Sequence, residues 1–125
     1  MYKDLKVWGR NFSLEVLFDV FTGEEVLPDQ QKSLESFIGK ADEILSDSSE
    51  IEKYCANNSN GEVTLPVDNI FKYVVPVQLF IKRETSVRKV ALLCNYKFDE
   101  EAGCAIVFEN EKLRCICTQE EVQFI

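Results

Sequence analysis

Residues 28–45 read PDQQKSLESFIGKADEIL, and this stretch decides the fold class. Pro28 suits a first helical position, and Asp29 in the first turn favours the helix dipole. The apolar residues recur at the spacing of one helix face, at Leu34, Phe37, Ile38, Ala41, Ile44 and Leu45. We therefore predict an amphipathic helix over approximately residues 28–46, weakened only by Gly39.

A second, shorter helix follows. Residues 47–49 (Asp-Ser-Ser) break the first helix and supply a new N-cap. Ile51, Tyr54 and Cys55 then share one helical face. The polar run 57–61 ends the segment, so the predicted second helix covers approximately residues 48–56.

The segments on either side of the helices have the alternating pattern of β-strands. Upstream, we predict a hairpin of strands 2–8 and 13–21 with its turn at residues 9–11. Downstream, a helical turn within 66–72 precedes predicted strands at 74–82, 87–98, 104–109, 112–118 and 122–125. Pro76 indicates an edge strand or a bulge. The predicted fold is α+β, an antiparallel β-meander of about six strands with both helices packed on one face.

Length and composition predict one globular domain spanning residues 1–125, since 46% of the residues are hydrophobic. No apolar run approaches the roughly 20 residues of a membrane helix, so we expect no membrane partner. The first residues include Asp4 and lack an apolar core, unlike a signal peptide. We therefore expect a cytoplasmic protein.

The charge distribution is uneven. The formal net charge is -8, which disfavours direct nucleic-acid binding and favours a basic protein partner. Residues 22–62 hold ten acids and three bases, whereas the rest of the chain holds twelve acids and eleven bases. This segment is either a solvated helix face or an acidic docking surface. On the second interpretation the partner-binding residues are Glu24, Glu25, Asp42, Glu43, Asp47, Glu50 and Glu52.

The sequence lacks the usual catalytic residues. It contains no histidine, the commonest general base and metal ligand, and its five glycines form no phosphate-binding loop. We therefore predict no enzyme activity, no catalytic residue and no cofactor. The strongest catalytic alternative is the run 99–101 (Asp-Glu-Glu), which could hold a hard cation in a metal-assisted hydrolase. Its position just before Gly103 is also typical of an ordinary charged turn.

The five cysteines are predicted to be buried free thiols, because four of them lie in predicted strands. The alternative is a four-thiolate zinc site of Cys94, Cys104, Cys115 and Cys117, but their spacing lacks the usual two-residue knuckle. We therefore predict no metal. Cys115 and Cys117 are two residues apart, so we predict that they share a strand face with Leu113.

Trp8 is the only tryptophan and ends the first predicted strand beside Gly9. Tryptophan is highly buried on average, which favours a core position. The alternative is an exposed binding hot spot, where tryptophan is enriched.

Two stretches resemble a family of small bacterial domains of unknown function that tend to show an aromatic-Asp-x-Glu-His-Gly turn between two strands. They are residues 90–94 (VALLC) and residues 98–106 (FDEEAGCAI). Residues 8–9 (Trp-Gly) and 118–119 (Thr-Gln) are also similar to that family. The chain departs from the motif, with Phe98 where Trp is usual and Ala102 where His is usual. Any role of that histidine is therefore absent from this chain.

The resemblance implies a role beside secreted or contact-dependent toxins, where such domains look like immunity proteins. The leading hypothesis is an immunity protein that binds and neutralises a basic cognate toxin domain, with nucleases the favoured class. The second hypothesis is a structural or scaffold domain that self-associates through a sheet edge, with a homodimer as one outcome. The third is the metal-assisted hydrolase described above.

Overall fold

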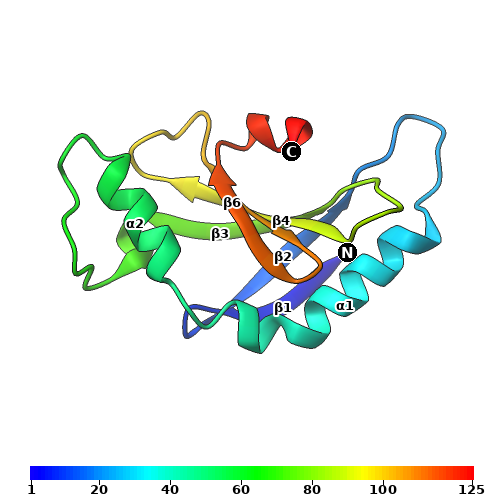
Figure 1. The fold of residues 1–125 in the computed structure, drawn as a ribbon, viewed down its shortest axis with the longest axis horizontal. Coiled ribbons are helices and arrows are strands. Elements are labelled where there is room, and N and C mark those ends of the chain that lie inside the picture. Colours follow the sequence, from blue (N-terminus) through cyan, green and yellow to red (C-terminus); the bar gives the residue numbers. More distant parts are fainter.

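The computed structural model describes residues 1–125 and contains one six-stranded sheet with two α-helices (Figure 1). The strands follow the order β1-β2-β3-β4-β5-β6 across the sheet. Their bounds are β1 (Tyr2–Val7), β2 (Arg10–Phe18), β3 (Val74–Ile81), β4 (Lys89–Tyr96), β5 (Cys104–Glu109) and β6 (Lys112–Cys117). The helices are α1 (Pro28–Ile44), α2 (Ser49–Asn57) and the short 3-10 helices η1 (Ile70–Lys72) and η2 (Glu120–Phe124). The α+β class, the two helices and the helical turn within 66–72 are thus confirmed.

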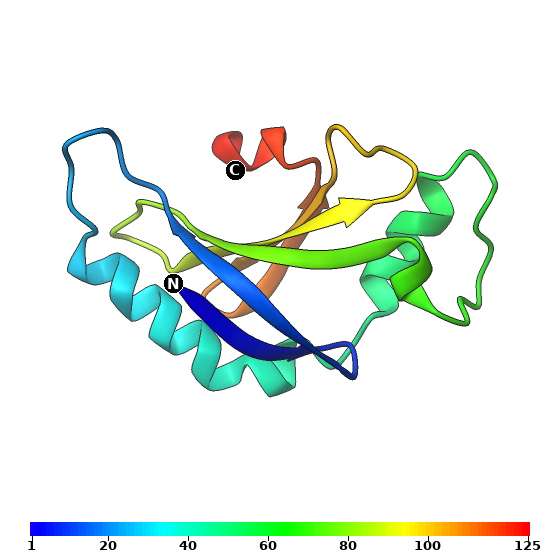
Figure 2. The ribbon, with the colours of Figure 1, turned by 180° about the vertical axis from the view of Figure 1, so that it is seen from behind.

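The predicted antiparallel meander is wrong at one pairing. β2 and β3 are parallel, whereas every other neighbouring pair is antiparallel. The chain leaves β2, crosses one face of the sheet through α1 and α2, and returns to start β3 in the same direction (Figures 1 and 2). A connection that contains helices is long enough for such a crossover, while a short turn is not.

The parallel pair is fixed at one end by Gln30, a fully buried residue in the first turn of α1. Its Nε2 donates to the backbone carbonyls of Asp19 (3.0 Å) and Ile81 (3.2 Å), which follow β2 and end β3. Its Oε1 accepts from the Leu27 backbone N–H at 2.9 Å. One amide side chain therefore joins the start of α1 to the ends of both parallel strands.

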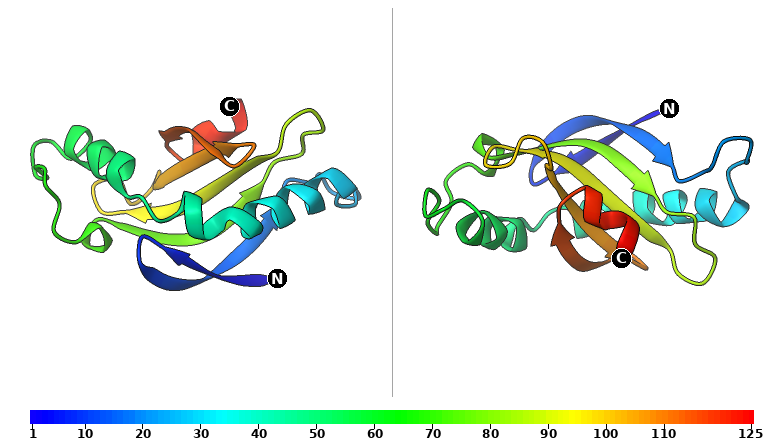
Figure 3. Two further views of the ribbon diagram at one scale, coloured as in Figure 1. Left: turned by 60° about the horizontal axis from the view of Figure 1, so that its bottom comes forward. Right: turned by 90° about the horizontal axis from the view of Figure 1, so that it is seen from above.

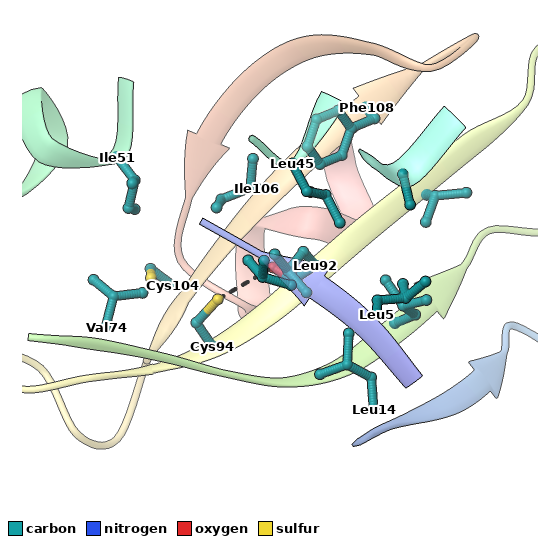
Figure 4. Close-up of a cluster of buried hydrophobic side chains, with 14 of the residues drawn as sticks. Leu5, Leu14, Leu45, Ile51, Val74, Leu92, Cys94, Cys104, Ile106 and Phe108 are labelled. Atoms are coloured by element: carbon teal, nitrogen blue, oxygen red, sulfur yellow. Dashed lines mark hydrogen bonds between the residues drawn. The ribbon is translucent and has the colours of Figure 1, made fainter. Parts of the chain in front are cut away.

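The main core lies between the helices and one face of the sheet. Alternate residues of each strand point toward it, as the two-residue period of a strand requires. Leu14, Leu92 and Ile106 are examples (Figure 4). Phe37 of α1 is fully buried in this core.

The opposite face of the sheet carries a second, smaller core that includes Ala91, Val107 and Cys117. It is covered by η2, where we had predicted a last strand over residues 122–125 (Figure 3). Val122 of η2 is buried against these strands. The prediction failed because a segment as short as residues 122–125 fits one helical turn as well as one strand.

Lys82, just beyond β3, holds η2 in place. Its side chain is buried, and its Nζ donates to the carbonyls of Val122 (3.0 Å) and Ile125 (2.7 Å). A buried ammonium is stable only when it is paired, and here its partners are the carbonyls that end the helix.

Replacing Lys82 with methionine is expected to destabilise the protein by about 1–3 kcal/mol, because two charge-assisted hydrogen bonds are lost while the apolar stem is kept. Urea unfolding measures this loss, and hydrogen exchange should show η2 opening first. Lys112→Met, at an exposed position, is the matched control. Equal stability of the two variants would contradict the anchoring role.

Several local predictions need correction. The first turn lies at Trp8 and Gly9, both with positive φ (48° and 87°), so β2 begins at Arg10 and ends at Phe18 rather than spanning 13–21. This two-residue loop twists in the sense that a hairpin requires. Pro76 lies in a central strand, so the edge-strand interpretation is wrong and the bulge, between Pro76 and Gln78, is confirmed. No helix is both long and apolar enough to cross a membrane.

Candidate acidic pocket

The seven predicted partner-binding acids lie at two ends of α1. Glu24 and Glu25 precede the helix, while Asp42 and Glu43 lie in its last turn. A helix of 17 residues is about 25 Å long, so the two ends are far apart. Asp47, Glu50 and Glu52 follow at the junction with α2. The seven acids do not form one patch.

Glu24 and Glu25 belong to the loop between β2 and α1. The Glu24 carboxylate accepts from the Phe21 backbone N–H at 2.9 Å and lies 3.4 Å from an Arg83 guanidinium nitrogen. Arg83 also donates to the Glu25 carbonyl at 2.9 Å. These contacts hold the loop between β2 and α1 in place, which gives Glu24 a structural role.

The acids at the helix junction are of two kinds. The Ser48 hydroxyl donates to Glu52, which is half-buried within α2. Asp47 and Glu50 are exposed. The Ser49 backbone N–H donates to Asp47 at 2.9 Å and lowers the pKa of that carboxyl below its usual value, which favours a carboxylate at neutral pH. Glu50 forms an ion pair of 3.2 Å with Lys53, and both side chains remain more than half exposed.

Asp47 and Glu50 border an apolar pocket of about 120 Å³ between the helix junction and the β5–β6 hairpin. Because of these two carboxylates we call it the acidic pocket. They are its only two polar lining residues among ten. The apolar walls come from the β1–β2 turn, α1, α2, β5 and β6, and they include Trp8, Ile44, Ile51, Ile106, Leu113 and Ile116. An apolar cavity with two carboxylates at its rim suits an apolar anchor that is flanked by basic groups.

The pocket continues into a shallower groove of about 370 Å³ between α2 and β6. The two hollows share Glu50, Leu113 and Ile116 in their walls. On the α2 side the groove is lined by Lys53 and Tyr54, among others. Pocket and groove together run from the helix junction along β6, and we refer to them as the α2–β6 groove.

Leu113 reaches this groove because of a bulge in β6. Leu113 pairs with Phe108 and Cys115 pairs with Val107, so Arg114 is the extra residue between them. The bulge places Leu113 on the helix face and Cys115 on the opposite face, where Cys117 also lies. Our prediction that Leu113 shares a face with these cysteines was therefore wrong.

Trp8 lies between the two alternatives that we considered for it, a core position and an exposed binding site. It is partly buried and packs on the main core, with its ring centroid 6.0 Å from that of Phe71. It also lines the acidic pocket. The side chain is thus part core and part pocket wall.

The five cysteines are free thiols, as predicted, and all except the half-buried Cys115 are buried. Cys94 and Cys104 are opposite each other in the main core, whereas Cys115 and Cys117 belong to the other face of the sheet (Figure 4). Burial raises the pKa of the Cys94 thiol well above its ordinary value, so it stays protonated at neutral pH. The four thiols do not converge, and no group of three or more metal-ligating side chains is placed to hold a metal ion.

Residues 99–101 form a turn between β4 and β5. The Asp99 carboxylate accepts from the Ala102 backbone N–H at 3.1 Å, and the Asp99 carbonyl accepts from the Gly103 N–H at 2.8 Å. All three acidic side chains are exposed. The geometry matches the ordinary charged turn, with Asp99 as the residue that closes it.

The same turn brings together part of the residues that carry the family resemblance, while Trp8 and Gly9 lie apart in the β1–β2 turn. Gly103 adopts a φ of 60° and packs against the Cys94 carbonyl and the Gln119 side chain. Gln119 donates from its Nε2 to the Cys94 carbonyl at 2.9 Å and from its backbone N–H to the Ala102 carbonyl at 3.2 Å. The motif therefore locks the β4–β5 turn to the segment before η2.

Comparison with known proteins adds the family. The model of a domain of unknown function (DUF6985) matches residues 2–123, nearly the whole described fold. No curated protein and no solved structure matches the chain. The match covers every strand and both helices, and on that basis the chain belongs to the DUF6985 family.

Proposed function

We propose that this protein is a noncatalytic binding protein that engages a basic protein partner at the acidic pocket. The observation that carries the proposal is the composition of the pocket wall, in which Asp47 and Glu50 are the only polar residues. Buried apolar anchors supply most of the binding energy in protein interfaces, and rim charges select the partner and speed its approach.

Charge supports the same choice of partner. The chain carries a net charge of -8, and Asp42, Glu43, Asp47 and Glu50 follow one another closely around the helix junction. A basic protein is attracted over a distance of about one Debye length, roughly 8–10 Å at physiological salt. Glu24, Glu25 and Glu52 have no place in this narrower site, because the first two lie at the far end of α1 and the third is half-buried.

The finer form of the proposal is an immunity protein that neutralises a basic cognate toxin domain, with nucleases the favoured class. It is supported by the resemblance in the β4–β5 turn and by the acidity of the chain. Such a protein would act in the cytoplasm. Capture with the proteins encoded by neighbouring open reading frames is the direct experiment. A single basic protein that is toxic when expressed alone would support immunity, and capture of no such protein would count against it.

The acidic pocket itself is tested by charge reversal. Asp47→Lys combined with Glu50→Lys is expected to slow association with the captured basic protein by about tenfold at low salt, because rim charges control the encounter rate. Stopped-flow kinetics at several salt concentrations measure this effect. The matched control is Asp4→Lys combined with Glu25→Lys, which changes the net charge equally at exposed positions outside the pocket. An equal loss in both variants would mean that only the overall charge matters.

A second candidate, self-association through a sheet edge, is favoured by the two terminal strands of the open sheet. β1 and β6 each have only one neighbouring strand. Unpaired edges can join a second copy. Sedimentation velocity at several concentrations tests this candidate, because a constitutive dimer would support self-association and a monomer at all concentrations would rule it out.

A further inference from the structure

The outer edge of β6 faces open space beside the α2–β6 groove. β6 is the last strand of the sheet and pairs only with β5. Its residues from Lys112 to Arg114 are exposed, and Leu113 is 43% exposed despite being a large apolar residue. An exposed strand edge beside an apolar hollow is the geometry that accepts an added strand.

The register shows which backbone groups point outward. Asn110 and Glu111 form a two-residue loop with φ of 49° and 63°, so the flanking pair Glu109 and Lys112 exchanges hydrogen bonds. The next pair, Phe108 and Leu113, is then of the non-hydrogen-bonded kind. The N–H and C=O of Leu113 consequently point away from β5, next to the pocket that its side chain lines.

The turn before β6 is held rigidly, which keeps this edge in place. The Arg88 guanidinium contacts both oxygens of the buried Glu111 carboxylate, at 2.8 and 3.0 Å. The Arg88 backbone N–H donates to the Asn110 side chain at 3.1 Å, and the Arg88 carbonyl accepts from the Asn110 N–H at 2.8 Å. Little conformational entropy remains to be lost there when an additional strand pairs with β6.

The charges around the groove select its occupant. The bases at the groove, Lys53 and Arg114, are already paired with Glu50 and Glu109 at 3.2 and 3.3 Å. Asp47 has no cation partner, and Asp42 and Glu43 lie just before it. A second copy of this chain, with its net charge of -8, would bring like charges together at this surface.

Resting on the proposed function, we infer that the basic partner contributes an extended segment that pairs with the outer edge of β6. The segment lies in the α2–β6 groove and carries an apolar and a basic residue two positions apart, so that both side chains lie on the strand face that points toward the helices. The apolar side chain enters the pocket beside Trp8, and the Lys or Arg two positions away meets Asp47. Backbone pairing supplies affinity, and the pocket and Asp47 supply specificity.

A short peptide serves as the probe: it is about seven residues long to match one strand, its odd positions are valine and lysine in turn, and its even positions are threonine. Trp8 is the only tryptophan and lines the pocket, so its fluorescence reports occupation directly. The decisive control is the same peptide N-methylated at two adjacent central residues. Adjacent residues point their N–H groups to opposite edges, so this change disrupts pairing on both edges and keeps every side chain.

The unmodified peptide is expected to shift the Trp8 fluorescence saturably, and N-methylation should weaken its binding by at least about tenfold, as loss of strand pairing predicts. Equal binding of both peptides would overturn edge pairing and leave the proposed function intact. No fluorescence response to the unmodified peptide would likewise overturn the inference, whereas the proposed function is judged separately by the Asp47 and Glu50 variants. If the same peptide with glutamate in place of each lysine bound as well, the choice of a basic occupant would be overturned.

Discussion

The Gly103→Ala variant is expected to lose about 3–5 kcal/mol of stability, through left-handed backbone strain and a clash with a carbonyl that cannot move away. Gly103 has a φ of 60°, and an added Cβ would lie 2.7 Å from the Cys94 carbonyl oxygen and 2.5 Å from the Gln119 Nε2. The Gln119 side chain can rotate, but the Cys94 carbonyl belongs to the end of β4. Urea unfolding with a shared m-value measures the loss.

Gly39→Ala is the matched control for this variant. Gly39 lies inside α1, and an added Cβ there would meet nothing within 4 Å. Alanine is the better helix former, so this variant should gain about 0.5–1 kcal/mol. If the two variants change the free energy of unfolding in opposite directions, the effect at Gly103 comes from its local geometry and not from the loss of a glycine as such. A destabilised Gly39→Ala variant would contradict this interpretation.

The Phe37→Ala variant is expected to lose about 3–5 kcal/mol, because it leaves a cavity at the contact between α1 and the sheet. The Phe37 side chain is fully buried and meets the Phe108 ring edge-on, with centroids 5.2 Å apart. That contact attaches α1 to β5. A shift in the urea midpoint should therefore accompany weaker packing of the whole helix.

Phe21→Ala is the control for this prediction, since Phe21 is 74% exposed and lies in the loop before α1. Its loss should stay within about 0.5 kcal/mol. A Phe37→Leu variant keeps most of the volume and should lose less than Phe37→Ala. If all three variants had the same midpoint, α1 would not depend on this contact.

The helices were predictable because their signals are local. The stripe of Leu34, Phe37 and Ala41 belongs to one helix face, and the observed α1 ends within two residues of the prediction. The buried residues of α2, Ile51 and Cys55, were likewise visible from spacing alone. The strands were placed within a few residues for the same reason.

The direction of β3 relative to β2 could not be predicted, because the alternation of apolar and polar residues is the same for a parallel and an antiparallel strand. Both orientations would bury the same residues of β3, such as Leu79 and Ile81. One contact that holds the parallel arrangement is made by Gln30, a polar residue outside the apolar stripe of the predicted helix. Its complete burial depends on three partners from separate segments, and no local pattern records that.

The candidate site was predictable only in part. Excess negative charge pointed to residues 22–62, and Asp47 and Glu50 are in that segment. The apolar pocket between them was not visible, because its walls come from segments as distant as Trp8 and Ile116. The bulge at Arg114, which moves Leu113 to the helix face, also has no local signature.

The parallel contact between β2 and β3 divides the assembly of the sheet into unequal steps. β1 and β2 are joined by a two-residue turn, and β3 to β6 follow one another through short connections. We expect the strands within each of these two groups to pair quickly. Pairing β2 with β3 requires closure of the loop formed by residues 19–73. The conformational entropy of that loop is lost before the hydrogen bonds of the parallel pair form and stabilise the sheet. We therefore expect the arrival of β2 on the edge of β3 to limit the rate of folding. Until that step, β3 is itself an unprotected edge, and the order of synthesis delivers β1 and β2 well before the strand that receives them.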